Sequence, residues 1–357
     1  MKIQSAIRTY DVSFSDNAIE GCRSLLEFYR PGRPFFFVDA NVARLYAESL
    51  SGLLGLGDAL VIDALESNKE YVRMAAFIQH LLDRGFRKSD VLVTVGGGIL
   101  QDISGFLATV LFRGIRWVLV PTTLLAQADS CLGSKTSINF GSAKNLVGSF
   151  YPPHQVIIDT KFCETLTDGD VNSGIGEIIK FHLMSDTAGY ATLQRYLAYT
   201  GRPGAGLLRE MTESTLAIKA AYVRDDEFDR GRRNLCNYGH CFGHALESAS
   251  DFTVVHGEGV VVGMAAANRV ALRRGAISRP LFDELESLLR QHFPAFDLSL
   301  VSPDDVVRFM RKDKKRTGAG LTVIVLKAVG DLSKWDDVTE EEAREAYAEL
   351  AGGKGRA

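Results

Sequence analysis

Residues 91–110 of the chain read VLVTVGGGILQDISGFLATV, and this stretch decides the fold. Val91 to Val95 is a short apolar run rich in β-branched residues, which is typical of a strand buried on both faces of a sheet. Three glycines follow, and a helical pattern begins at about Leu100. A strand that passes through glycines into a helix is typical of the phosphate-binding turn of a nucleotide-binding α/β unit.

Strand and helix patterns alternate on both sides of this stretch. Strands are predicted at 34–38, 59–62 and 117–120, and helices at 41–53 and 71–82. Strands that alternate with helices at this spacing predict a parallel sheet with helices packed on it.

The pattern changes after Asp159. Apolar residues then recur at helical spacing around 170–185, 208–224, 233–250, 257–274 and 280–291. Residues 321–326 predict a strand or hairpin, and the spacing TxxE at 339–342 predicts a capping box at the start of a last helix. We therefore expect an N-terminal nucleotide-type α/β domain over residues 1–160 and a mostly helical C-terminal domain over residues 161–357.

The composition excludes several classes of protein. The chain has 357 residues, of which 46% are hydrophobic and 24% charged, so it is neither disordered nor fibrous. Its net charge of −3 gives no general attraction to nucleic acid or to acidic membranes. No apolar run approaches the ~18 residues of a membrane span, and residues 1–10 lack the apolar core of a signal peptide. Five cysteines without a CxxC pair indicate reduced thiols and a cytoplasmic location.

The glycines at 96–98 are the first candidate site. Glycine lets the backbone approach a pyrophosphate, and the N-terminus of the following helix favours its negative charge. The full GxGxxG spacing is absent, so a tight turn without a ligand is the alternative. Asp39 and Asn41 follow the strand predicted at 34–38, where an acidic side chain either contacts a ribose hydroxyl or caps a helix.

Three of the seven histidines are close together in the sequence. His240 and His244 are four residues apart, on one face of a helix, and His256 follows within twenty residues. Cys241 stands where a zincin peptidase needs glutamate, so peptidase chemistry is not supported. Glu177, in GIGEIIK, is a carboxylate that would complete a His/His/Glu metal site. A satisfied or surface-exposed histidine pair is the alternative.

A further set of cations is embedded in apolar or glycine-rich sequence. These residues are Lys135, Lys144, Lys180, Lys219, Arg233 and Lys314. A buried cation needs an anionic partner, so in a chain of negative net charge this set predicts a small, polyanionic substrate.

Taken together, these motifs resemble those of the 3-dehydroquinate synthase family and the wider sugar phosphate cyclase superfamily. The resemblance runs from VDANV near residue 38 to DKK near residue 315. It includes the stretch from VTVGGG to KTSIN, followed in order by AKNLVGSFYPP, GIGEIIK, RNLCNYGHCFGHALE and HGEGVVVGM. It implies the dehydroquinate synthase-like fold and a reaction in which NAD oxidises a hydroxyl, phosphate is eliminated, the ketone is reduced again and an aldol step closes a carbocycle. NAD is regenerated in this reaction.

The resemblance also implies roles for individual residues. Glu177, His240 and His256 fall on the ligands of a zinc or cobalt ion, and His244 on a histidine that takes part in proton transfer. Positions that contact NAD in the family are Asp39, Asn41, Glu66, Lys69, Gly96, Gly97, Gly98, Asp102, Thr122, Thr123 and Asp129. Positions that bind substrate are Lys135, Lys144, Asn145, Lys180, Lys219, Arg233, Asn237 and Lys314, and Lys144 is also assigned to the cofactor. Arg113 matches an arginine that reaches into the neighbouring subunit's site, which implies a homodimer.

Two residues depart from the family pattern. Gln101 stands where the family usually has glycine, which bears on NAD packing. Ser134 replaces the second glycine of a GGKT motif, which bears on the choice of substrate.

The leading hypothesis is conversion of 3-deoxy-D-arabino-heptulosonate 7-phosphate to 3-dehydroquinate, because Arg233 resembles the residue that faces the substrate carboxylate. One alternative is a cyclase of the 2-deoxy-scyllo-inosose synthase or sedoheptulose 7-phosphate cyclase type, whose substrates lack that carboxylate. Another is a metal-dependent polyol dehydrogenase, which would produce NADH. No matched site residue is missing, so a binding protein without catalytic activity is not favoured.

Overall fold

The structure is a computed structural model that describes residues 1–29, 32–141, 143–199, 201–311 and 320–352. None of the helices in these ranges is both long and apolar enough to cross a membrane.

The chain divides into two compact units, and each is interrupted in sequence. The first comprises Met1–Leu166 and Pro203–Phe228, and the second comprises Thr167–Arg202 and Asp229–Ala357. The division into domains 1–160 and 161–357, expected from the sequence, stays a prediction.

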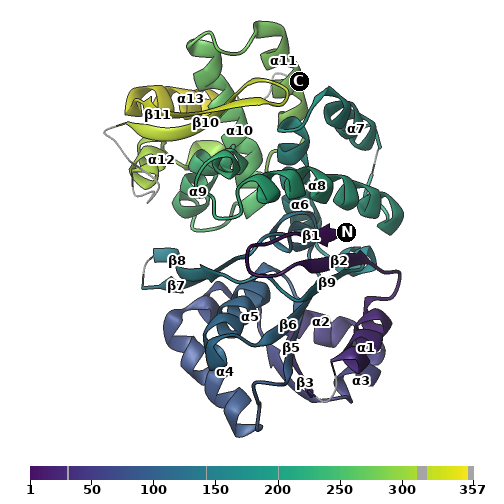
Figure 1. The fold of residues 1–357 in the computed structure, drawn as a ribbon. Helices are drawn as coiled ribbons and strands as arrows, with labels where there is room; N and C mark the ends of the chain where they lie inside the picture. The colour runs from purple at the N-terminus through teal and green to yellow at the C-terminus, as the bar shows by residue number, and fades with distance from the viewer. Residues whose placement is uncertain (30–31, 142, 200, 312–319, 353–357) are drawn as a thin grey trace. The chain divides into compact units, whose positions relative to one another are not determined.

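A seven-stranded sheet forms the centre of the first unit, in the order β1-β2-β9-β6-β5-β3-β4 (Figure 1). The strands are Lys2–Ile3 (β1), Tyr10–Phe14 (β2), Pro34–Asp39 (β3), Asp58–Ile62 (β4), Val91–Gly96 (β5), Arg116–Pro121 (β6) and Gln155–Ile158 (β9). β1 is antiparallel to β2, and every other neighbouring pair in this sheet is parallel. The parallel sheet predicted from the alternating pattern is therefore confirmed.

Helices and a hairpin complete the first unit. The helices are Ala18–Phe28 (α1), Ala40–Leu45 (α2), Ala47–Leu54 (α3), Tyr71–Asp83 (α4), Gly98–Val110 (α5) and Ala205–Asp225 (α8), with short helical turns at Glu66–Lys69 (η1), Leu111–Arg113 (η2), Ala126–Ser130 (η3) and Thr160–Thr165 (η4). Lys135–Phe140 (β7) and Ala143–Phe150 (β8) form an antiparallel hairpin. The helix predicted at 41–53 is broken at Tyr46 into α2 and α3.

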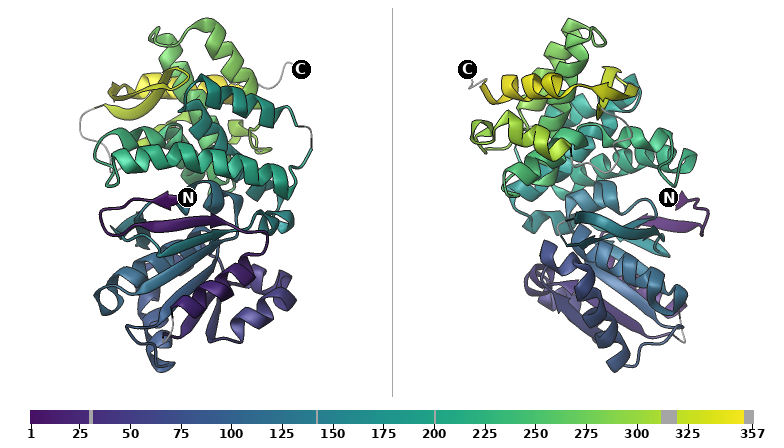
Figure 2. Two further views of the ribbon diagram at one scale, coloured as in Figure 1. Left: turned by 45° about the vertical axis from the view of Figure 1, so that its right-hand side comes forward. Right: turned by 90° about the vertical axis from the view of Figure 1, so that its left-hand side faces the viewer.

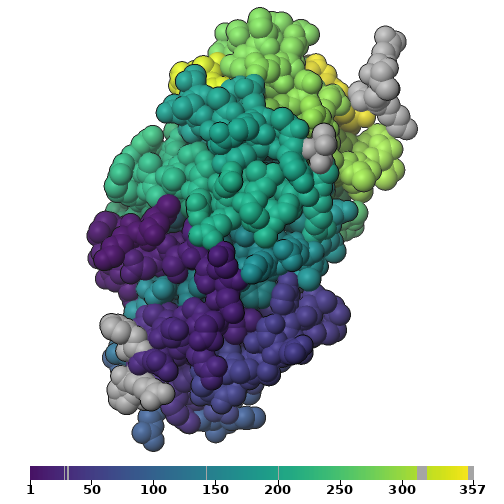
Figure 3. Space-filling model, turned by 90° about the vertical axis from the view of Figure 1, so that its right-hand side faces the viewer, coloured from purple at the N-terminus to yellow at the C-terminus, as the bar shows by residue number. Residues whose placement is uncertain are grey.

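Residues along β3 alternate between two apolar cores, one on each face of the sheet. Phe35 and Phe37 belong to a cluster that includes residues of α4 and α5. Phe36 and Val38 pack instead with residues of α1 and α3. Figure 2 shows helices on both sides of this sheet, and Figure 3 shows the N-terminal segment, in purple, at the surface of this unit. Burial on both faces is the reason that these strands are continuously apolar.

The order of the strands reverses at β3. After β3 the chain forms β4 on one side, and α4 then returns it to β5 on the other side, next to β3. In open α/β sheets, ligands bind outside the carboxyl ends of the strands at such a reversal. Asp39 ends β3 and Gly96 ends β5, and a Cβ atom added to Gly96 would lie 3.4 Å from the Cβ atom of Asp39.

The second unit is mostly helical. Its helices are Asp168–Leu183 (α6), Thr187–Leu197 (α7), His240–Ala249 (α9), His256–Arg273 (α10), Arg279–Arg290 (α11), Pro303–Met310 (α12) and Glu340–Gly352 (α13), with short turns at Arg232–Asn237 (η5) and Leu298–Leu300 (η6). The hairpin predicted from residues 321–326 is present as Leu321–Ala328 (β10) and Asp331–Val338 (β11). The helical segments predicted around 170–185, 208–224, 257–274 and 280–291 are confirmed, and the one at 208–224 is α8, which belongs to the first unit. The segment predicted at 233–250 is helical only over His240–Ala249, because Gly239 adopts a left-handed conformation between the turn η5 and α9.

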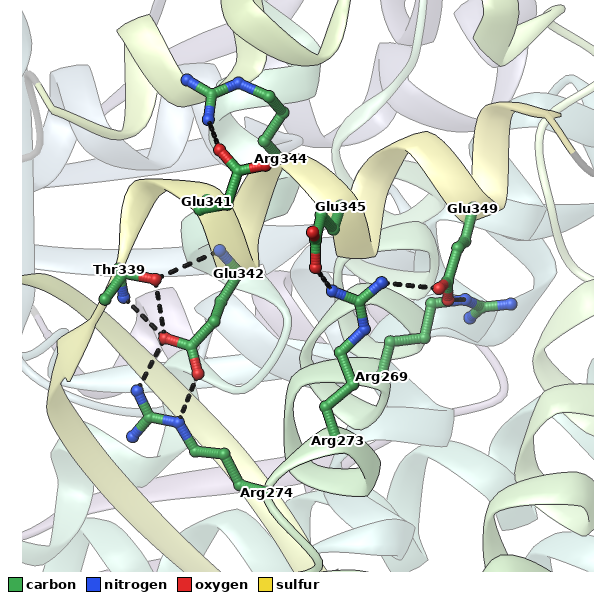
Figure 4. A network of polar contacts seen from close by, with 9 residues as sticks. All are labelled: Arg269, Arg273, Arg274, Thr339, Glu341, Glu342, Arg344, Glu345 and Glu349. Atoms are coloured by element: carbon green, nitrogen blue, oxygen red, sulfur yellow. Dashed lines mark hydrogen bonds and ion pairs between the residues drawn. The ribbon is translucent and has the colours of Figure 1, made fainter.

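Ion pairs join the C-terminal end of α10 to α13 (Figure 4). Arg274 donates to both carboxylate oxygens of Glu342, from Nε at 2.7 Å and from Nη2 at 2.8 Å. Arg273 pairs with Glu345 and with Glu349. Glu342 also completes the predicted capping box, because its Oε2 accepts a hydrogen bond from the N–H of Thr339 at 2.8 Å, while Thr339 Oγ1 accepts one from the N–H of Glu342.

Candidate active site

Three helices of the second unit approach one another closely at glycines. A Cβ atom on Gly176 of α6 would lie 2.3 Å from the carbonyl oxygen of Gly257 on α10. A Cβ atom on Gly243 of α9 would lie 2.9 Å from the carbonyl oxygen of Gly259, also on α10. Only glycine fits at such distances, so the backbones of α6 and α9 pack directly against α10.

This close packing gathers the three predicted histidines. His240 begins α9, His244 lies one turn further along it, and His256 begins α10. Their candidate ligand atoms all lie within 4.8 Å of one another. Glu177 of α6 joins them, because its Oε1 is 3.6 Å from His240 Nε2 and 3.4 Å from His256 Nε2. Residues from three helices that are distant in sequence therefore meet at one point.

Glu177 is a buried carboxylate directed at ring nitrogens. Its side chain is fully buried, its Oε2 pairs with the Lys180 ammonium, and its Oε1 accepts no hydrogen bond from any residue that the structure describes. Burial raises the pKa of Glu177, but Lys180 and His256 outweigh it and lower that pKa to about 2. A charged carboxylate oxygen beside histidine nitrogens is a donor set that suits zinc and similar divalent ions. The residues present therefore fit a metal.

Two further groups orient the histidines. Glu247 Oε1 is 2.9 Å from His256 Nδ1, and the carbonyl oxygen of Tyr238 is 3.2 Å from His240 Nδ1. Such partners fix the tautomer of a metal-binding imidazole and leave Nε2 free for the ion. Sequence reasoning missed Glu247, although its spacing of three from His244 and seven from His240 places it on the same face of α9.

The pKa values of the two histidines nearest Glu177 are shifted in opposite directions. Burial and the nearby Lys180 lower the pKa of His240 well below its ordinary value. Burial also opposes the charging of His256, but the carboxylates of Glu177 and Glu247 outweigh it and raise the pKa of His256 to about 10. Metal ligation requires a neutral imidazole, so a cation that binds here releases a proton from His256.

The other predicted residues of the second unit are placed as follows. Lys180 is 1% exposed and faces Glu177. Arg233 is 6% exposed, on η5, and Asn237 at the end of the same turn donates from Nδ2 to the carbonyl oxygen of Asn234 at 2.8 Å. Lys314 lies outside the described residues.

In the first unit, the glycines after β5 have different surroundings. A Cβ atom on Gly97 would lie 2.8 Å from Cγ2 of Thr123, so packing within the protein requires glycine there. A Cβ atom on Gly98 would meet only Ser130 Oγ, at 4.0 Å. Open space at Gly98, at the N-terminus of α5 and at the strand reversal, fits a bound pyrophosphate.

Asp39 caps the N-terminus of α2, which was the alternative to a contact with a ribose hydroxyl. Its Oδ1 accepts hydrogen bonds from the backbone N–H groups of Asn41, at 2.8 Å, and of Val42, at 3.4 Å. These bonds cap α2 and do not involve Oδ2. Thr122 follows β6 directly, and its N–H donates to the carbonyl oxygen of Gly96 at 3.1 Å.

Lys69 is the centre of a polar network. Its Nζ lies 2.8 Å from Asp102 Oδ2 and donates to Asn145 Oδ1 at 2.9 Å. Burial raises the pKa of Asp102, while Lys69 opposes that rise. Asn139, which sequence reasoning missed, donates to Glu66 Oε1 at 2.8 Å and accepts from the N–H of Asn145 at 2.9 Å. Predicted cofactor and substrate residues are thus joined in one network.

Lys219 forms a second charged contact in this unit. Its Nζ lies 2.6 Å from Asp129 Oδ1, and only 6% of the residue is exposed.

The expectation that the embedded cations are buried holds for only part of the set. It is confirmed for Lys180, Lys219 and Arg233. It is wrong for Lys135 and Lys144, which are exposed on the β7–β8 hairpin. Side chains alternate across a hairpin, so the neighbours of Lys135 turn inward while the lysine faces outward. Burial therefore gives no argument for an anion at these two residues.

Comparison with known proteins adds sequence evidence. The model described as 3-dehydroquinate synthase N-terminal matches residues 59–173, and that described as 3-dehydroquinate synthase C-terminal matches residues 174–316. A 3-dehydroquinate synthase of Ruegeria sp. (strain TM1040) is 34% identical over 358 residues, which cover 96% of this chain and 95% of that protein. A 3-dehydroquinate synthase of Dichelobacter nodosus is 37% identical over 309 residues, covering 85% and 83%.

Solved structures add similarity of fold. A 2-deoxy-scyllo-inosose synthase complexed with carbaglucose-6-phosphate, NAD+ and Co2+ superimposes with a TM-score of 0.87 at 24% identity and covers 98% of this chain and 99% of that one. The 2-epi-5-epi-valiolone synthase of Streptomyces hygroscopicus, with NAD+ and Zn2+ bound, gives a TM-score of 0.83 at 25% identity and the same coverage. An iron-containing alcohol dehydrogenase shares the fold at a TM-score of 0.67 and 14% identity.

Proposed function

Since the chain belongs to the 3-dehydroquinate synthase family, we propose that it converts 3-deoxy-D-arabino-heptulosonate 7-phosphate to 3-dehydroquinate and phosphate. The observation that supports this choice of substrate is the sequence identity to proteins of known name. Curated 3-dehydroquinate synthases match at 34% and 37% identity, whereas the two solved cyclases of other names match at 24% and 25%. A pathway enzyme of this kind acts in the cytoplasm.

Glu177, His240 and His256 hold a divalent zinc or cobalt ion in this proposal. The fit described above supports it, since a buried charged carboxylate oxygen and two Nε2 atoms converge. When bound, the ion polarises a substrate oxygen and stabilises the negative charge that develops there. His244 is the exposed member of the cluster, which suits a group that exchanges protons with substrate and solvent. Glu247 keeps His256 oriented.

NAD is held at the strand reversal of the first unit. The residues assigned to it are Asp39, Asn41, Glu66, Lys69, Gly96, Gly97, Gly98, Asp102, Thr122, Thr123, Asp129 and Lys144. When bound, NAD accepts a hydride from the substrate and later returns it. The open space at Gly98 admits the pyrophosphate. The ion pair between Lys69 and Asp102, which lies one turn further along α5, holds the polar network in place.

The substrate carries a phosphate and a carboxylate, and the proposed cations hold both in one orientation through successive steps. Arg233 binds the carboxylate, and the remaining substrate residues are Lys135, Asn145, Lys180, Lys219, Asn237 and Lys314. Asn145 Oδ1 accepts a hydrogen bond from Lys69 Nζ at 2.9 Å, which joins a proposed substrate residue to a proposed cofactor residue.

The functional unit is a homodimer in which Arg113 reaches the partner's site. Phe112 and Arg113 have consecutive positive φ values of 50° and 60°, and both side chains are exposed. An aromatic residue in the left-handed region is unfavourable, and strain of this kind persists where it serves a function. The strained turn presents Phe112 and Arg113 outward, which supports a role in contact with a second copy.

A phosphate-release assay tests the proposed reaction. The enzyme, with NAD and Zn2+ or Co2+, is incubated with 3-deoxy-D-arabino-heptulosonate 7-phosphate, sedoheptulose 7-phosphate and glucose 6-phosphate. We expect release of phosphate from the first substrate at the highest kcat/KM, without net NADH. Faster release from either sugar without a carboxylate would assign the chain to another cyclase activity, and net NADH from a polyol would assign it to the dehydrogenases.

The variant Arg233→Lys sharpens this assay. A lysine cannot reproduce a bidentate contact of guanidinium with carboxylate, so kcat/KM should fall by about 10- to 100-fold. A decarboxylated analogue should react poorly with the native enzyme and should be nearly insensitive to the substitution. Equal losses with both substrates would remove Arg233 from the carboxylate site.

A further inference from the structure

The turn that carries Asp129 is a π-helical turn, η3. The N–H of Cys131 donates to the carbonyl oxygen of Ala126, five residues earlier, at 2.9 Å. Such turns are rare and recur at functional sites. Here the turn directs both the carboxylate and the carbonyl oxygen of Asp129 at the Lys219 ammonium, at 2.6 Å and 2.5 Å.

The first half of η3 is anchored to the sheet by its own side chain. Gln127 Nε2 donates to the carbonyl oxygens of Pro121, at 2.9 Å, and Asp159, at 2.8 Å. These acceptors lie at the carboxyl ends of β6 and β9. Gln127 is fully buried, so this anchor is protected from water.

The end of η3 is held from outside the turn, by Gln101 of α5. Gln101 Nε2 donates to the carbonyl oxygen of Ser130 at 2.7 Å, and Ser130 Oγ donates to Gln101 Oε1 at 2.8 Å. Both ends of one amide thus bind a single residue, which is the neighbour of Asp129. Gln101 is 7% exposed, and neither glycine nor an apolar side chain at this position makes these bonds.

We infer that Gln101 is a positioning residue, which fixes Ser130 and thereby holds Asp129 in the orientation that receives Lys219. This inference rests on the proposed function, in which Asp129 contacts NAD and Lys219 contacts the substrate. Gln101 stands where the sequence resemblance expects glycine, so this chain holds its π-helical turn with a bond that glycine cannot supply. Gln101 acts through Asp129 and does not touch the reacting groups.

The variant Gln101→Met tests the inference, because methionine keeps the length of the side chain without its amide. Two partly buried hydrogen bonds are lost, so the Kd for NAD in a calorimetric titration should rise by about tenfold. The KM for the sugar phosphate should rise similarly, while kcat changes less than about threefold. Amide hydrogen exchange at Ser130 and Cys131 should become at least about tenfold faster, with no change at Leu107 on α5.

Ser104→Ala is the matched control. Ser104 lies on the same helix and is fully buried, and its hydroxyl has no hydrogen-bond partner within the described ranges. Its loss should leave exchange at Ser130, NAD affinity and KM unchanged. Ser130→Ala removes only one of the two bonds and should show a smaller effect, which disappears in a Gln101→Met background because the two residues act as a pair.

Unchanged exchange at Ser130 in Gln101→Met would overturn the inference, as would unchanged affinity for NAD. Should Gln101→Met fail to fold, Ser130→Ala serves in its place, since it removes the bond from Ser130 Oγ and keeps the bond from Gln101 Nε2 to the carbonyl oxygen of residue 130. Intermediate exchange at residue 130 supports the inference, and native exchange contradicts it. Absence of phosphate release by the native enzyme would instead reject the proposed function. The hydrogen-exchange and NAD-affinity measurements would still test whether Gln101 positions Asp129.

Discussion

The two ends of α10 differ in how they use charge. At the N-terminal end, His256 lies between the carboxylates of Glu177 and Glu247, and glycine contacts hold the helices together. At the C-terminal end, Arg273 pairs with the exposed Glu349 and Arg274 with the partly exposed Glu342, both of α13 (Figure 4). One helix therefore carries a buried charge cluster suited to chemistry and an exposed one suited to stability.

The difference follows from solvation. Buried charges interact strongly because water does not screen them, and removing one partner leaves the other uncompensated. Exposed ion pairs are screened, and each contributes at most about 1 kcal/mol. We therefore expect substitutions at the N-terminal end of α10 to affect function or folding severely, and those at its C-terminal end to affect stability slightly.

The largest effect is expected for His256→Ala. Losing a metal-binding side chain should remove the ion and lower turnover by more than about 100-fold, while the apolar core of the second unit keeps the protein folded. Metal content by elemental analysis and turnover by phosphate release measure both effects. Full metal occupancy in the variant, at native thermal stability, would remove His256 from the metal site.

The next largest effect is expected for Gly257→Ala. The added Cβ atom would lie 1.8 Å from the carbonyl oxygen of Ser173 on α6, so the two helices must separate. The midpoint of urea unfolding should fall by an amount equivalent to about 1–3 kcal/mol, the usual scale of overpacking.

Gly206→Ala on α8 is its control, because a Cβ atom there has no neighbour within 4 Å. This second change should be neutral or should stabilise by up to about 1 kcal/mol. Equal effects of the two substitutions would show that helix contact at Gly257 is unimportant.

A smaller effect is expected for Glu342→Gln, at the other end of α10. Glutamine keeps the capping bond to Thr339 but loses the charge that pairs with Arg274, so stability should fall by about 0.5–1 kcal/mol at pH 7. The Arg274 contact lowers the pKa of Glu342 from 4.5 to about 2. Its contribution is therefore complete above about pH 5 and is lost as the pH falls towards 2.

Urea unfolding of both proteins at several pH values measures this linkage. The difference between native protein and variant should shrink steadily below pH 5. A difference that stays constant down to pH 2 would mean that the charge of Glu342 does not contribute.

The smallest effect is expected for Arg273→Ala. Its partners Glu345 and Glu349 are 50% and 53% exposed, so water and salt screen both pairs. Stability should change by less than about 0.5 kcal/mol, and 1 M salt should abolish the difference. A loss as large as that of Gly257→Ala would contradict the contrast between the two ends of α10.

The sequence predicted the parts of the fold whose signal is local. Strands such as 91–95 are apolar throughout because both faces are buried, and the capping box at Thr339 depends on neighbours in sequence. Short elements were missed, among them β2, which alternates polar and apolar residues over only five positions, and the four-residue strand β9. The break between α2 and α3 at Tyr46 was also missed, because no glycine or proline marks it in the sequence.

The candidate site divides in the same way. The spacing of His240 and His244 pointed to a shared helical face, but their meeting with Glu177 depends on glycine contacts between distant helices. Asn139 was missed because its partners come together only through the fold of the β7–β8 hairpin. The exposure of Lys135 was mispredicted because flanking residue types do not say which face of a hairpin a side chain occupies.

The assignment of α8 to the first unit affects how the chain folds as it is synthesised. Leu216 and Val223 of α8 belong to the same apolar cluster as Phe35 and Leu92 of the sheet. The ribosome completes Leu166 and must add about 60 more residues before this helix is available, which takes on the order of several seconds. Until then the apolar cluster lacks the side chains that α8 contributes, and α6 and α7 emerge before this cluster is complete. A nascent chain stalled after Leu166 should therefore bind chaperones at this incomplete cluster, and that binding should fall when a chain stalled beyond Phe228 has α8 outside the exit tunnel.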